Sequence, residues 1–77
     1  MSDRGLMERA VRRGVLKPLG SEGSLDVQGL WEQRRTAFTT LEVIWDPGSQ
    51  RVLGGVRSVD GVELSAEEVR AELGLAL

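Results

Sequence analysis

Hydrophobic and polar positions follow two different periods along the 77-residue chain. Near the N-terminus, apolar residues recur at the spacing of one helical face, which predicts a helix over residues 3–14. Ser2 or Asp3 is placed to cap its start, and Gly14 and Pro18 are placed to end it. The apolar stripe of this helix consists of Leu6, Met7, Ala10 and Val11.

The strongest strand signal covers residues 36–46, which are rich in β-branched, aromatic and aliphatic residues. Both faces of this strand are partly apolar, because Leu41 and Trp45 alternate with Phe38 and Ile44. A strand covered on one side only is expected to be more polar on the other side. We therefore expect cover on both faces, from the chain itself or from a partner.

Two reversals are predicted after this strand. Residues 46–49 read Asp-Pro-Gly-Ser, and we expect Gly48 to adopt a positive φ in the turn. The chain then returns as a strand over residues 50–59. Gly54 and Gly55 within it indicate a bulge or the close approach of another backbone.

The C-terminal third begins with a second reversal at residues 60–61. Asp-Gly is the preferred pair for a two-residue hairpin, and a short third strand over residues 62–64 is expected to follow. Ser65 and Glu68 then have the spacing of a capping box, which predicts a helix that ends at Gly74.

Residues 25–35 fit a helix face and a strand about equally well, and we favour an irregular or strand-like segment. The predicted fold is therefore a single α+β domain over residues 1–77. It consists of a small two- to three-stranded antiparallel sheet, built on a hairpin, with an N-terminal and a C-terminal helix.

The composition limits the chemistry, because the chain has no His, Cys or Tyr. We expect no cofactor and no metal site, and we expect the protein not to be an enzyme. The carboxylates of Glu42 and Asp46 are the distant catalytic alternative. No apolar run approaches the ~20 residues of a membrane span, so we expect no membrane contact and a cytoplasmic location.

The net charge of −2 conceals an uneven distribution of charged residues. Residues 1–20 hold five basic and two acidic side chains, whereas the rest of the chain is acidic. This basic segment supports an alternative function as a nucleic-acid-associated regulator. The residues that would contact phosphates are Arg9, Arg12, Arg13, Lys17, Arg34 and Arg35.

A chain of this length buries only about 60% of its unfolded surface, and no disulfide is available to reinforce the core. Our main hypothesis is therefore a non-enzymatic protein-binding module, a small regulatory or assembly subunit. Its partner would be a larger protein or a second copy of the chain, as a homo-oligomer. The candidate interface residues are Trp31, Phe38, Trp45, Leu75 and Leu77, although both tryptophans also suit a core position.

Overall fold

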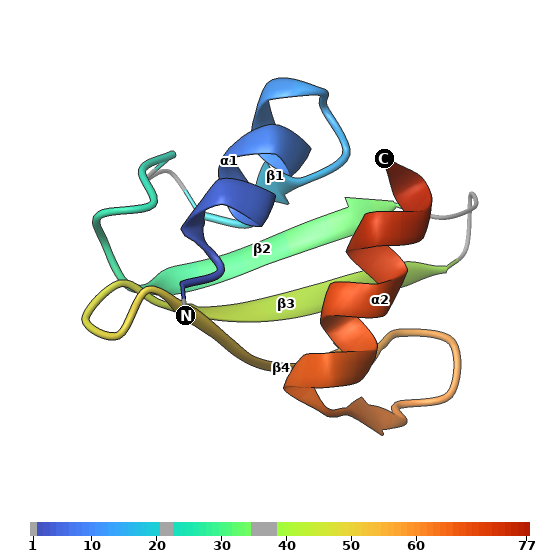
Figure 1. The fold of residues 1–77 in the computed structure, drawn as a ribbon. Coiled ribbons are helices and arrows are strands. Elements are labelled where there is room, and N and C mark those ends of the chain that lie inside the picture. The colour runs from blue at the N-terminus through green and yellow to red at the C-terminus, as the bar shows by residue number, and fades with distance from the viewer. Residues whose placement is uncertain (1, 21–22, 35–38) are drawn as a thin grey trace.

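The fold is known from a computed structural model, which describes residues 2–20, 23–34 and 39–77. Each strand pairs antiparallel with the next strand along the chain, so the sheet has the order β1-β2-β3-β4-β5. A meander is thus flanked by one helix at each end of the sequence (Figure 1). The elements are α1 (Arg4–Arg12), β1 (Lys17–Pro18), β2 (Gly29–Arg34), β3 (Thr40–Asp46), β4 (Arg51–Arg57), β5 (Glu63–Leu64) and α2 (Ala66–Ala76).

The prediction of a two- to three-stranded sheet is wrong, since the sheet has five strands. The α+β class and the positions of the two helices fit. The missing strands are β1 and β2. β2 lacks a clear alternation of apolar residues because Leu30 and Trp31 are adjacent and face opposite sides of the sheet. β1 has only two residues, too few to show a pattern.

Both helices contribute to one core on one side of the sheet. α2 crosses the strands in Figure 1, and α1 lies beside the β1–β2 edge. Among the described residues, the expected cover is found on one face only. Leu41 and Trp45 are buried, but Ile44 between them is 36% exposed. The core consists of Met7, Ala10, Leu16, Leu25, Trp31, Leu41, Val43, Trp45, Val52, Val69 and Leu73.

Asp3 joins three elements at a single buried point. It occupies the N-cap position of α1, but its side chain makes no capping hydrogen bond. One carboxylate oxygen instead accepts from the backbone of Val52 in β4 at 2.8 Å. The other accepts from Arg70 Nε of α2, also at 2.8 Å. The Asp3 carboxylate therefore connects both helices to the sheet.

The β3–β4 reversal is present, but its backbone differs from the predicted turn. The Asp46 carboxylate accepts from the amides of Gly48 and Ser49 and from the Ser49 hydroxyl. The residue with positive φ is Gln50, at 56°, and not Gly48. Side-chain hydrogen bonds of Asp46 therefore direct this turn.

The β4–β5 connection is also longer than the predicted two-residue hairpin. The Arg57 amide donates to the Val62 carbonyl at 3.0 Å, so four residues separate the paired positions. Asp60 accepts from the Arg57 guanidinium and from the Val62 amide, which stabilises the longer loop. The capping box at Ser65 and Glu68 is confirmed.

The glycines in β4 permit a bulge and a close approach, as predicted. The register shifts where Ile44 and Trp45 of β3 meet β4, and Gly54 has a φ of 155°. A Cβ on Gly55 would lie 2.9 Å from Val69 Cγ2 of α2. Gly55 therefore allows α2 to pack directly onto the strand. The helix itself continues past Gly74 to Ala76, so the predicted end is wrong.

Candidate functional site

The side of the sheet opposite the helices carries a line of exposed apolar side chains. Leu30 lies opposite Ile44, and Ile44 lies opposite Gly54. Leu19 extends the line beyond β1, since its amide donates to the Leu30 carbonyl. Leu53, at the bulge beside Gly54, adds a fourth side chain. These four residues, here called the apolar row, are between 36% and 56% exposed.

A line of charged residues runs beside the apolar row. Lys17 lies opposite Glu32, and Glu32 lies opposite Glu42. Like charges placed directly opposite each other are unfavourable in a sheet. Arg34, two residues further along the same face of β2, reaches Glu32 with an Nη2–Oε1 distance of 3.9 Å. The open face therefore combines an apolar strip with a charged border, which is the layout of many protein interfaces.

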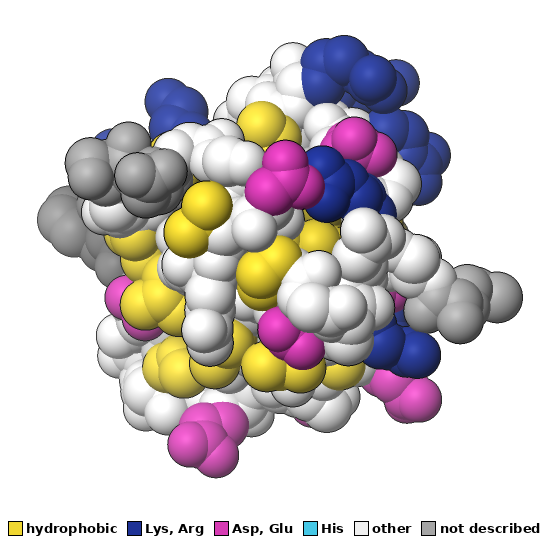
Figure 2. Space-filling view, turned by 90° about the vertical axis from the view of Figure 1, so that its left-hand side faces the viewer, with side chains coloured by type: hydrophobic (Ala, Val, Ile, Leu, Met, Phe, Trp, Pro, Cys, Tyr) yellow, Lys and Arg dark blue, Asp and Glu magenta, His cyan; other side chains and the backbone are white. Residues whose placement is uncertain are grey.

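The end of the molecule beside the β3–β4 turn has a mixed surface. Figure 2 looks onto the end of the molecule that carries the β3–β4 turn. Hydrophobic side chains reach the surface there in several places, with acidic side chains among them. The surface is thus neither uniformly polar nor uniformly charged at this end.

The candidate interface residues from the sequence are dispersed in the structure. Trp31 and Trp45 are buried, and Trp45 Nε1 donates to the Leu25 carbonyl at 2.8 Å. Both tryptophans therefore belong to the core, which the sequence analysis gave as the alternative to an interface position. Leu75 is exposed on α2, and Leu77 packs partly against the core. Phe38 lies outside the described residues.

The basic residues fall into two groups. Arg9, Arg12 and Arg13 are exposed at the C-terminal end of α1, and basic side chains cluster at the top of Figure 2. Arg13 Nη1 donates to the Leu77 carbonyl at 3.2 Å. Lys17 and Arg34 form the second group, in a pocket between β1 and β2. Arg35 lies outside the described residues.

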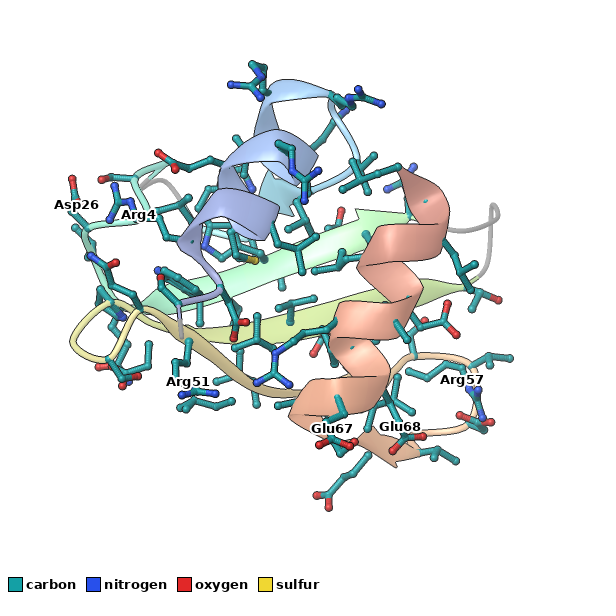
Figure 3. All side chains as sticks on the ribbon, in the orientation of Figure 1. Arg4, Asp26, Arg51, Arg57, Glu67 and Glu68 are labelled. Carbon is teal, nitrogen blue, oxygen red and sulfur yellow. The ribbon has the colours of Figure 1, made fainter. Side chains whose placement is uncertain are left out.

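Hydrogen bonds perturb two exposed carboxylates, and both belong to turns. The Ser49 hydroxyl lowers the pKa of Asp46, and the Arg57 guanidinium lowers the pKa of Asp60. Figure 3 labels Arg57, the last residue of β4. Asp46, one of the two catalytic alternatives, is thus engaged within its own turn.

The residues that the structure describes contain no group of three or more acidic side chains placed to hold a metal ion. None of their helices is both long enough and apolar enough to cross a membrane.

Compared with protein-family models, curated proteins and solved structures, the chain matches none. The description of its surface therefore rests on the residues themselves. The sequence analysis missed the apolar row because the row requires the register of β1, β2 and β3. The available signal was the alternation of Leu30 with Glu32 and Arg34, which places all three on one face of a strand.

Proposed function

We propose that this chain is a non-enzymatic protein-binding module that self-associates through the open face of its sheet. The observation that supports the proposal is the apolar row, which crosses from Leu19 to Leu53 without cover from either helix. Contiguous exposed apolar surface with a polar border is typical of protein interaction sites.

A second copy is the occupant that matches this face in shape and size. Strands spaced by about 4.8 Å, with about 3.3 Å per residue, give the 24 strand residues a flat area of roughly 380 Å² before side-chain relief is added. A standard interface takes about 800 Å² from each partner. The face must therefore be used almost entirely, and another flat sheet of equal extent does so. Sheets pack face to face in this way about 10 Å apart.

The edges of the sheet favour the same mode of association. β1 and β5, at the two edges, have two residues each. Such short strands offer few free backbone groups for edge-to-edge pairing with another chain. Association through the face is therefore favoured over extension of the sheet.

Sedimentation equilibrium over a range of micromolar concentrations tests the proposal. We expect the wild-type chain to dimerise and the double variant Leu30→Lys/Leu53→Lys to remain monomeric. Val59→Lys is the matched control, since Val59 is at least as exposed but lies in the β4–β5 loop. A wild-type chain that is monomeric at all concentrations would contradict the proposal, and so would equal dissociation of the control.

A nucleic-acid-associated regulator is the second candidate function. It is favoured by the three exposed arginines at the end of α1, Arg9, Arg12 and Arg13. An electrophoretic mobility shift at low and high salt tests it, with Arg12→Ala/Arg13→Ala as the variant. Loss of binding in this variant supports the second candidate, whereas absence of binding by the wild type at low salt excludes it.

A further inference from the structure

Leu53 is the most exposed side chain of the apolar row, at 56%. It occupies the bulge in β4, between the residues that pair with Trp45 and Ile44 of β3. A bulge interrupts the regular pleat and changes the direction of the side chain at that point. Leu53 is therefore an apolar projection on the open face, on one side of β3.

A hollow of about 230 Å³ lies at the start of β2, on the other side of β3. Leu30 and Val27 line it with apolar side chains, and each residue is more than 40% exposed. Gly20 and Gly29 line it without a side chain, and a Cβ on either glycine would have no neighbour within 4 Å. The hollow is therefore open and is bordered by apolar groups.

The Leu53 projection and the hollow lie at the same level along the strands. Gly29 and Leu30 pair with Trp45 and Ile44 of β3, and Leu53 lies between the partners of the same two β3 residues. β2 and β4 flank β3 at about 4.8 Å on opposite sides. A two-fold axis that runs along β3, between two copies packed face to face, therefore places Leu53 of each copy on the hollow of the other.

The charged residues of the open face fit the same axis. One level of the sheet is formed by residues that pair in turn across the five strands, namely Lys17, Glu32, Glu42, Val56 and Glu63. Lys17 and Glu63 lie at the two ends of this level, and both are exposed. An axis along β3 reverses the strand order of the second copy, so Lys17 of each copy faces Glu63 of the other.

An axis across the strands would give neither contact. It would place every strand on its own copy, so that Leu53 would face β4 and Lys17 would face β1. The axis along β3 has one unfavourable contact, because Glu42 lies on β3 and meets its own copy. The favourable contacts occur twice in the dimer, whereas this repulsion occurs once.

We propose that two copies pack face to face about a two-fold axis along β3, with Leu53 of each copy seated in the hollow of the other. Lys17 of each copy pairs with Glu63 of the other copy. This inference rests on the proposed self-association and adds the geometry of the dimer. The seated leucines give the close packing of an interface, and the charge pairs fix the relative orientation of the two sheets.

Disulfide cross-linking tests the position of Leu53, because the chain has no cysteine of its own. Val27→Cys/Leu53→Cys should form a covalent dimer in a glutathione redox buffer, as seen on a non-reducing gel. Val27→Cys and Leu53→Cys are the controls and should each form far less, because the axis keeps each residue away from its own copy. No covalent dimer from the double variant would overturn the proposal, and so would equal cross-linking of Leu53→Cys alone.

Charge reversal tests the contacts at the sheet edges, with sedimentation equilibrium at low salt as the measurement. Lys17→Glu and Glu63→Lys should each raise the dimer dissociation constant about fivefold or more, because each creates two like-charge pairs. Lys17→Glu/Glu63→Lys should return to within about twofold of wild type. Glu67→Lys, at the start of α2 and labelled in Figure 3, makes the same charge change as Glu63→Lys and should leave the dissociation constant unchanged.

The wild-type chain, measured in the same experiment, separates failure of this geometry from failure of the self-association. A wild type that dimerises, with a double reversal that is no tighter than the single reversals, would overturn the geometry alone. A wild type that stays monomeric would contradict the self-association itself. Glu42→Gln should dimerise more tightly than wild type, because it removes the repulsion at the axis, and weaker dimerisation would contradict the axis along β3.

Discussion

At the scale of single residues, the structure depends on polar groups with several partners. Asp3 accepts from both the Val52 amide and Arg70 Nε, at 2.8 Å each. Such a group contributes more to stability than an exposed ion pair does, because its loss leaves a buried hydrogen-bond donor without an acceptor. The sequence indicated that Asp3 could begin a helix, but its partners are 49 and 67 residues away. No local pattern can predict contacts of that separation.

Asp3→Ala is expected to lower the free energy of unfolding by about 2–3 kcal/mol, because the Val52 amide and Arg70 both lose their acceptor. Urea unfolding followed by circular dichroism measures the change. Asp26→Ala is the control. It removes an exposed ion pair with Arg4, labelled in Figure 3, and should cost less than about 1 kcal/mol. Equal losses of unfolding free energy in the two variants would show that the Asp3 carboxylate does not connect the helices to the sheet.

Gly55→Ala is expected to destabilise the protein by about 1–3 kcal/mol, because a Cβ at this position would overlap both β3 and α2. The Glu42 carbonyl oxygen would lie only 2.6 Å from it. Thermal and urea unfolding measure the loss. Gly5→Ala is the matched control, since a Cβ there has no neighbour within 4 Å and alanine favours a helix. A Gly55→Ala protein of wild-type stability would disprove the close packing of α2 on β4.

At the scale of elements, the sequence predicts the features that depend on residues close together in the chain, such as helix starts and turns. The helix start at Ser65 follows from a capping box, and the β3–β4 reversal follows from its turn residues. β2 could not be assigned in the same way, because Leu30 and Trp31 obscure its alternation. Its strand state depends on pairing with β3, and a five-stranded sheet follows only from that pairing.

The role of the Asp60 carboxylate in stabilising the β4–β5 loop can be tested through the pH dependence of stability. The folded state lowers the pKa of Asp60, chiefly through its hydrogen bonds with Arg57. The stabilisation is therefore present above the ordinary aspartate pKa of about 4 and is lost as the pH falls through the lowered folded value. Asp60→Asn should be less stable than wild type at neutral pH, and the difference should shrink at pH values below about 4.

Urea unfolding of both proteins at several pH values measures this difference. Asp26→Asn, which alters an exposed carboxylate paired with Arg4 in another part of the molecule, serves as the comparison. A difference between wild type and Asp60→Asn that is constant with pH would contradict the assigned role of the Asp60 carboxylate.

At the scale of the whole molecule, the arrangement of layers determines the proposed function. Both helices pack on one side of the sheet, and the apolar row is left on the other side. The sequence hinted at this through the two partly apolar faces of its main strand. It could not show which face the helices cover, because that depends on the packing of α1 and α2. It also could not show that both tryptophans are buried.

A dilution series of amide nuclear magnetic resonance spectra tests the central claim, because it locates the surface that changes as copies associate. We predict concentration-dependent shifts at Leu30, Ile44 and Leu53, and unchanged signals on the outer surface of α2. Concentration-dependent shifts confined to the helices would contradict the account, and so would spectra that do not change over the whole series.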